Sequence, residues 1–168
     1  MDAALIAEIA AGTVVSLRQF LPSSFSLTPA SDKSDQAWER QWRPMSTRRP
    51  PNGGWDWPSC RHKAPTGIFT ALWCKHETEL CGLLLLRLND TACRIAMLEG
   101  SPYPHHSMRG IVLLTALEFA AMFAQKTGRQ DLWICGPIGD MVLRHLLTDY
   151  GFELLKPRKG FPFCRKAV

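Results

Sequence analysis

The stretch Ser101-Pro-Tyr-Pro-His-His-Ser-Met-Arg-Gly-Ile-Val112 decides the fold, because it joins a glycine-bearing loop to a long apolar helix predicted over 112–125. A strand is predicted next at Asp131–Cys135, then a helix over 139–150, and then a further strand at Gly151-Phe152-Glu153. The first N–H groups of a helix have no partner inside it, and the helix dipole adds positive potential there. The loop is therefore predicted to bind an anion such as a phosphate group.

Three sequential antiparallel strands are predicted before this loop, at 68–75, 79–88 and 92–98. Lys75-His-Glu-Thr-Glu79 and Asn89-Asp90 supply the polar turns between them. The strand at 131–135 follows a crossover helix and should run parallel to its neighbour. The predicted fold class is α/β (α+β), with a mixed, mostly antiparallel sheet flanked by helices.

The first 65 residues follow a different pattern. A helix is predicted over 2–21, a loop over 22–34, and a short helix capped by Ser34 or Asp35 that carries Trp38 and Trp42 on one face. Residues 44–65 contain many Pro and Gly and are predicted to lack regular structure. The length of 168 residues fits a single domain over 1–168, with an atypical helical and loop-rich part at 1–65 and a core at 66–168.

The six cysteines contain no C-x-x-C pair, which argues against a zinc ribbon and against a secreted disulfide framework, and no metal is predicted. Cys74 and Cys81 can face each other across a hairpin, although two reduced, half-buried thiols are the favoured interpretation. The longest central apolar run, 81–86, is far shorter than the roughly 20 residues that span a bilayer. No basic segment precedes the apolar residues 3–11. The sequence therefore predicts a cytoplasmic protein without membrane contact.

The order and spacing of the C-terminal elements resemble the GNAT superfamily of acyl-CoA-dependent N-acyltransferases over roughly residues 66–156. The family's loop reads approximately Pro-x-x-(Gln/Arg)-x-x-Gly-x-(Gly/Ala), and Pro104, Ser107, Gly110 and Val112 stand at those places. Pro104 and Gly110 match this pattern. Val112 adds a Cβ where the backbone of family members approaches pyrophosphate closely.

A second family pattern, Asn-x-x-Ala-x-x-x-Tyr-x-x-x-Gly-Phe, ends here at Gly151-Phe152 and places Asp140, Leu143 and Leu147 at its Asn, Ala and Tyr. The resemblance implies acetyl-CoA or another acyl-CoA as cofactor, with Asp140 at the pantetheine-contacting position. It also implies that the pyrophosphate is cradled by Ser107, Met108, Arg109, Gly110 and Ile111, with Arg109 as the charged contact.

The chemistry that the resemblance implies is direct attack of an amine on the acyl-CoA thioester. Glu99, at the end of the strand that enters the loop, is the candidate base, and a loop-stabilising carboxylate is its alternative. His105 and His106 are the other candidate bases. The family's acid falls at Leu147, so Tyr150, one turn further on, is the candidate acid unless it packs under the Gly-Phe turn.

Trp55 and Trp57 lie between glycines and arginines, where they can form a wall of the acceptor pocket or fix the loop to the sheet. The acceptor amine can belong to a small molecule, a peptide or an aminoacyl-RNA, and a dimer remains open. The net charge of +5 favours a polyanionic partner or only a soluble surface. The alternative function is a catalytically degenerate GNAT-fold protein that binds a protein or nucleic acid through its basic, Trp-rich N-terminal half.

Overall fold

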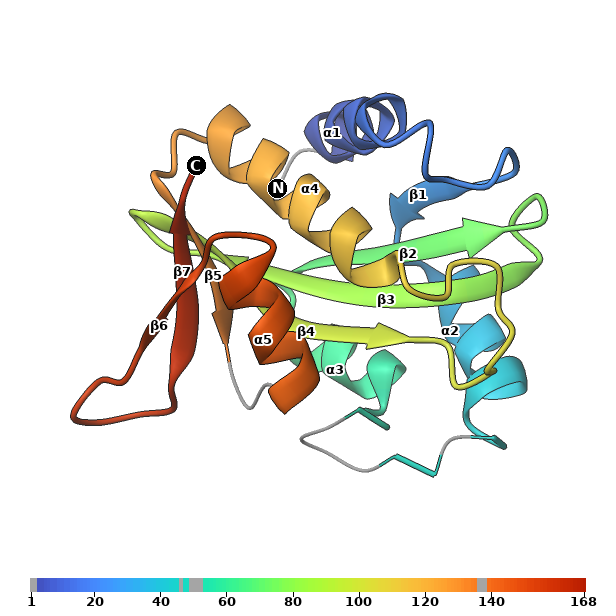
Figure 1. The fold of residues 1–168 in the computed structure, drawn as a ribbon. Coiled ribbons are helices and arrows are strands. Elements are labelled where there is room, and N and C mark those ends of the chain that lie inside the picture. Colours follow the sequence, from blue (N-terminus) through green and yellow to red (C-terminus); the bar gives the residue numbers. More distant parts are fainter. Residues whose placement is uncertain (1–2, 46, 49–52, 136–138) are drawn as a thin grey trace.

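The computed structural model describes residues 3–45, 47–48, 53–135 and 139–168, and a seven-stranded sheet lies at its centre (Figure 1). The strand order is β1-β2-β3-β4-β5-β7-β6. Neighbouring strands are antiparallel except β4 and β5, which are parallel. The predicted mixed, mostly antiparallel sheet is therefore confirmed.

The central strands are those that the hydrophobic pattern predicts. They are β2 (Ile68–Cys74), β3 (Glu79–Leu88) and β4 (Ala92–Gly100). Helix α4 (Val112–Lys126) crosses over to β5 (Asp131–Cys135) and returns the chain parallel to β4. All seven residues of β2 are buried, which is why apolar runs rather than strict alternation mark this part of the sheet.

The predicted loop at 22–34 is partly wrong, because it contains β1 (Ser26–Pro29), which pairs with β2 at the sheet edge. Helix α2 (Asp32–Ala37) also begins earlier than expected. Its N-cap is Ser31, whose backbone N–H donates to Ser34 Oγ at 2.9 Å. The two expected caps therefore lie inside the helix. A π-helical turn, η1 (Trp38–Trp42), follows it directly.

The segment at 44–65 is not wholly irregular, because α3 (Trp57–Lys63) lies within it. The side chain of Asp56 accepts a hydrogen bond from the Ser59 backbone N–H at 3.0 Å, and Pro58 occupies the first turn, where a proline is tolerated. The first helix, α1 (Ala3–Ser16), is shorter than the predicted 2–21.

The C-terminal part begins with α5 (Asp140–Thr148), close to its predicted bounds. The strand that the sequence predicts after this helix is present as β6 (Glu153–Leu155), and a further strand that the sequence did not predict, β7 (Phe163–Ala167), follows it. β7 lies between β5 and β6 and pairs antiparallel with both.

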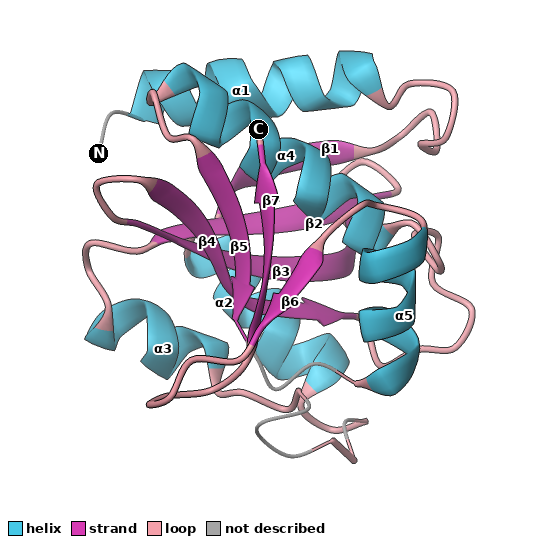
Figure 2. Cartoon of the chain, turned by 60° about the vertical axis from the view of Figure 1, so that its left-hand side comes forward, coloured by secondary structure: helices cyan, strands magenta, loops and turns pink. Residues whose placement is uncertain are grey.

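Helices cover both faces of the sheet (Figures 1 and 2). Helices α1 and α4 lie over one face, where the larger hydrophobic cluster includes Leu84, Phe119 and Phe123. α2, η1 and α3 lie over the other face, where Trp42 and Trp57 are buried. We refer to these as the α4 face and the α3 face.

Strands β4 and β5 are paired only over part of their length. The four pairs run from Ala92–Asp131 to Ile95–Ile134, so residues 96–100 at the carboxyl end of β4 have no partner on β5. The end of β4 that leads into the 101–111 loop therefore extends beyond its pairing with β5. This end of β4, beside the loop, is where the fold can admit a ligand.

Candidate functional site

The loop at 101–111 places the start of α4 beside the carboxyl end of β4, where Val112 lies next to Gly100. Two turns within it are closed by bonds from Arg109 N to His106 O and from Ile111 N to Met108 O, both 3.1 Å. Gly110 has a φ of +83°, a left-handed conformation that favours glycine, and no described atom lies within 4 Å of the place where its Cβ would stand. The backbone here is open to a ligand.

The helix itself supplies donors at this point. Its first internal bond is from Thr115 N to Ile111 O at 3.0 Å, so the amides of residues 112–114 have no acceptor within the helix. Together with the helix dipole, these amides can hold an anion. The anion site that the sequence predicts would therefore lie at the start of α4, beside the carboxyl end of β4.

The five loop residues predicted to contact pyrophosphate lie together but face different ways. Arg109 and Gly110 are exposed, and Arg109 Nη1 donates to the Pro104 carbonyl at 3.0 Å. Ser107 turns inward and donates to Glu79 Oε2 at 2.5 Å, while Met108 is fully buried. Ile111 is the N-cap residue of α4.

Asp140, the predicted pantetheine contact, is the exposed first residue of α5.

Val112 points toward the sheet. A Cβ placed on Gly82 would lie 3.2 Å from Val112 Cγ1, and one placed on Gly100 would lie 3.6 Å from its Cγ2. These two glycines are directly paired on β3 and β4. The paired glycines therefore make room for the branched side chain of Val112. The GNAT loop pattern has Gly or Ala at this place, and the additional methyl groups of the valine pack on the α4 face of the sheet.

Glu99 lies on β4 and its side chain is almost wholly buried, with 2% of its area exposed. Its Oε1 accepts the Gly54 backbone N–H at 2.7 Å, and its Oε2 accepts Trp57 Nε1 at 2.8 Å. Arg48 Nε lies 3.8 Å from Oε1, and Arg48 Nη2 donates to the Gly100 carbonyl at 2.7 Å. The carboxylate therefore joins β4 to Gly54 and to Trp57, the first residue of α3.

Trp55 and Trp57 differ in how much of their side chains is exposed. Trp57 is 2% exposed and packs edge-to-face on Phe69, with 6.4 Å between ring centroids. Trp55 is half-buried and packs edge-to-face on Trp57 at 6.0 Å. Trp57 thus anchors the segment to the α3 face, and Trp55 is the one whose ring retains exposed surface. A ligand contact remains available to Trp55.

Tyr150 lies on the other side of the sheet from Glu99. Its ring packs, half-buried, against the hydrophobic cluster of the α4 face, and its carbonyl accepts Lys166 Nζ at 2.7 Å. The two predicted catalytic groups are therefore not in contact. They flank the sheet from opposite faces.

A cavity of about 280 Å³ lies between the 101–111 loop and the residues Met45, Thr47 and Arg48. It is lined on one side by Tyr103, His106 and Arg109, and on the other by Thr47 and Arg48. Thr47 and Tyr103 were not predicted as site residues, because no local sequence pattern marks them. A larger cavity of about 660 Å³ lies at the start of β2, but it touches neither Glu99 nor the loop, so its size does not make it the site of the chemistry.

His106 is half-buried beside this cavity. Burial lowers the pKa of its imidazole, Glu79 opposes this change, and the positive charges of Arg109 and Arg48 add to it. Its Nδ1 is buried without a hydrogen-bond partner among the described atoms. His105, the other predicted alternative base, is exposed.

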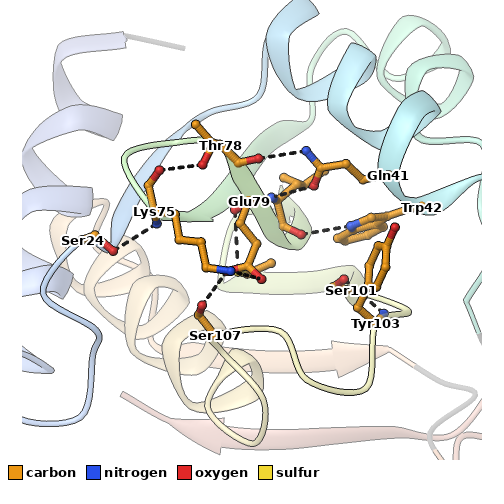
Figure 3. A network of polar contacts seen from close by, with 11 residues as sticks. Ser24, Gln41, Trp42, Lys75, Thr78, Glu79, Ser101, Tyr103 and Ser107 are labelled. Carbon is orange, nitrogen blue, oxygen red and sulfur yellow. Dashed lines mark hydrogen bonds and ion pairs between the residues drawn. The ribbon is translucent and has the colours of Figure 1, made fainter.

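The inward-facing side of the loop rests on the β2–β3 hairpin (Figure 3). Glu79 Oε2 accepts a hydrogen bond from Ser107 Oγ, and Glu79 Oε1 lies 3.4 Å from Lys75 Nζ. Burial acts to raise the pKa of this carboxyl group, but the contacts with Ser107 and Lys75 outweigh burial and the pKa is lowered. Cys74 and Cys81 are buried next to Glu79. The Cys81 thiol donates to the Glu79 carbonyl at 3.7 Å, and the proximity of the two thiols lowers the pKa of Cys74 and raises that of Cys81.

No helix in the described part of the chain is long and apolar enough to cross a membrane. A scan of protein-family models finds no match to the sequence, and a search of curated proteins finds none either.

Solved structures do resemble this chain. A GNAT family acetyltransferase from Elizabethkingia anophelis with acetyl-CoA bound is 12% identical, with a TM-score of 0.58 over 88% of this chain and 100% of that one. The PaiA N-acetyltransferase of Thermoplasma acidophilum, in complex with coenzyme A, is 13% identical, with a TM-score of 0.56 over 86% and 99%.

The ribosomal-protein-S18-alanine N-acetyltransferase of Escherichia coli is 10% identical, with a TM-score of 0.59 over 86% and 92% of the two chains. At these identities the likeness concerns the path of the backbone. The chain therefore has the GNAT fold, in a divergent form.

Proposed function

We propose that this chain is an acyl-CoA-dependent N-acyltransferase that transfers an acetyl or other acyl group to an amine by direct attack. The observation that supports this best is the coincidence of two features at one place. The pairing of β4 with β5 ends at Ile95 and Ile134, and the first amides of α4, which have no acceptor within the helix, lie beside the carboxyl end of β4.

The residues present fit a coenzyme A pyrophosphate at this position. Gly110 leaves open space in front of the backbone, Arg109 is an exposed cation on the same loop, and Val112 is turned toward the sheet. When bound, an acyl-CoA supplies the acyl group as an activated thioester. Asp140 is proposed to contact the pantetheine arm.

The roles of the chain's own residues follow from their positions. The end of β4, beyond its pairing with the described residues of β5, is proposed to offer a backbone N–H group that polarises the thioester carbonyl. Glu99 is proposed to accept the proton that the amine loses as its nitrogen bonds to the carbonyl carbon. The carbon–sulfur bond breaks, and Tyr150 is proposed to return a proton to the thiolate. Trp55 is proposed to contact the acceptor.

The acceptor is proposed to be an amine of a small molecule, a peptide or an aminoacyl-RNA, and the cytoplasmic location remains a prediction from the sequence. The rival function, a binding protein that uses a basic N-terminal half, receives less support. Arg43 pairs with Glu39 at 2.8 Å, and Arg61 pairs with two aspartates of α2. Arg49 lies outside the described residues.

Calorimetric titration of the purified protein with coenzyme A and acetyl-CoA tests the proposal. Saturable binding of both, with release of free thiol in the presence of an amine acceptor, is the expected result. Failure to bind either ligand, together with tight RNA binding that weakens steeply with salt, would favour the rival function.

A further inference from the structure

We propose that Cys74, Glu79 and Cys81 form a binding site for a thiophilic divalent cation, with Zn²⁺ as the physiological candidate. The proposal is independent of the acyltransferase function. It concerns the β2–β3 hairpin, which lies beneath the 101–111 loop (Figure 3).

The register of the hairpin brings the three side chains together. Cys74 is paired with Glu79, so the two side chains project to the same face of the sheet. A bulge follows, because Leu72 pairs with Gly82 and Trp73 with Leu80, which leaves Cys81 as an extra residue on β3. Cys81 joins Cys74 in the hydrophobic cluster of the α4 face. The two sulfurs and one carboxylate oxygen all lie within 4.8 Å of one another.

The donor set selects the metal. Two thiolates and a carboxylate are ligands that Zn²⁺ accepts, whereas Mg²⁺ and Ca²⁺ require oxygen ligands. With Zn–S bonds of about 2.3 Å, two tetrahedrally placed sulfurs lie roughly 3.8 Å apart. The present separations of up to 4.8 Å need movements of about 1 Å or less, which side-chain rotation can supply.

The surroundings are arranged as they are around bound metals. Ser107 Oγ donates to Glu79 Oε2 at 2.5 Å, a partner that orients the carboxylate from outside the ligand set. Both cysteines are fully buried, while the Glu79 side chain is 20% exposed, so a cation can enter past the carboxylate. Three protein ligands leave a fourth position for a solvent molecule.

Binding would change what holds the loop. At present the Cys81 thiol donates to the Glu79 carbonyl at 3.7 Å. A bound cation displaces the thiol protons, which go to solvent, and draws both sulfurs and Glu79 toward one point. Because Ser107 is bonded to Glu79, the metal then ties the 101–111 loop to the hairpin.

The first experiment uses the unaltered protein. The reduced, chelator-treated chain is titrated with Zn²⁺ and then alkylated, and each cysteine is followed by peptide mass spectrometry. One equivalent of Zn²⁺ should protect Cys74 and Cys81 under partly denaturing conditions that expose all thiols, while Cys60 and Cys135 keep their reactivity. Equal reactivity of all cysteines with and without Zn²⁺ would overturn the proposal, as would a Cys74–Cys81 disulfide that forms in preference to the metal complex.

The second experiment uses variants and Co²⁺ as a spectroscopic substitute. Thiolate coordination should give a charge-transfer band, and Cys81→Ser and Cys74→Ser should weaken binding more than the 10–100-fold typical of losing an outer partner. Ser107→Ala should stay within that range. Cys93→Ser is the matched control, because Cys93 is equally buried on the same face of the sheet but is not one of the three candidate ligands. If Cys93→Ser lowers affinity as much as Cys81→Ser, or if no band forms, the site does not exist.

Glu79→Gln serves where a buried cysteine variant fails to fold. Glu79 is partly exposed, so its amide replacement preserves shape and removes a charge. Weaker Co²⁺ binding by a metal-free protein that still unfolds cooperatively is the expected result. Unchanged affinity in this variant would remove Glu79 from the ligand set and contradict the proposal.

Discussion

Trp57 Nε1 donates a hydrogen bond of 2.8 Å to Glu99 Oε2, and this bond fixes the first turn of α3 to the end of β4. Gly54 N occupies the other carboxylate oxygen at 2.7 Å. Each oxygen also keeps a lone pair that can accept a further proton. Glu99 can therefore hold the segment in place and still act as a base.

Replacement of Glu99 by Gln tests its catalytic role. As the base, Glu99 should contribute roughly 10²–10⁴-fold to turnover, so the variant should lose that much kcat while its affinity for coenzyme A hardly changes. Turnover is measured by thiol release, and affinity by calorimetry. Trp57→Phe is the companion variant, because it removes the same hydrogen bond without removing the carboxylate. If both variants lose activity equally, Glu99 acts only as an anchor, and His106 becomes the better candidate base.

Replacement of Arg109 by Ala tests the anion loop. Arg109 should contribute one charge-assisted hydrogen bond to the pyrophosphate, worth about 1.5–3 kcal/mol. The variant should therefore bind coenzyme A about 10- to 150-fold more weakly. Arg158→Ala is the control, because Arg158 is equally exposed but lies between β6 and β7. Equal affinities for the two variants would place the pyrophosphate elsewhere.

The two tryptophans should separate in their effects. Trp57→Ala removes a buried ring and the Glu99 hydrogen bond, so we expect it to lower the free energy of unfolding by about 3–5 kcal/mol. Trp55→Ala should leave stability nearly unchanged and raise the KM for the acceptor without changing affinity for coenzyme A. Chemical denaturation and steady-state kinetics measure the two quantities. A Trp55 variant that kinetics cannot distinguish from the unaltered chain would exclude Trp55 from the acceptor site.

Sequence alone could predict the elements whose signal is local. The strands at 68–100 and the helix from Val112 carry apolar patterns long enough to identify, and the loop between them follows from the position of Gly110. Strands β1 and β7 are short and depend on pairing with distant segments, so no local pattern marks them. Helix α3 did carry a signal, since Asp56 precedes a proline in the first turn, but the many Pro and Gly nearby outweighed it.

The site was less predictable because its contacts join distant residues. The bond between Glu99 and Trp57 spans 42 positions, and the one between Ser107 and Glu79 spans 28. The sequence predicts that Cys74 and Cys81 can meet across a hairpin. The bulge that leaves Cys81 unpaired cannot be read from the sequence, because it depends on the register of β2 against β3.

Val112 should contribute to packing and not to cofactor exclusion. Its methyl groups fill the space over Gly82 and Gly100, so Val112→Ala should lower stability by about 1–3 kcal/mol by leaving a cavity. Affinity for coenzyme A should not increase, because the side chain points to the sheet. Thermal unfolding and calorimetry measure the two effects. A tenfold or greater gain in affinity would mean that the valine obstructs the pyrophosphate.

His106 should make the protein less stable in acid. Burial lowers the pKa of its imidazole in the folded state, so below about pH 6.5, the ordinary histidine value, the unfolded chain binds more protons than the folded one. Its contribution is therefore fully present above that pH and is lost as the pH falls through the lowered folded-state pKa. The free energy of unfolding, measured by denaturant titration between pH 5 and 8, should fall less steeply with acid in His106→Gln. His62→Gln is the control for the same substitution at an exposed position. Identical slopes for the unaltered chain and His106→Gln would show that His106 titrates as freely in the folded protein as in the unfolded one.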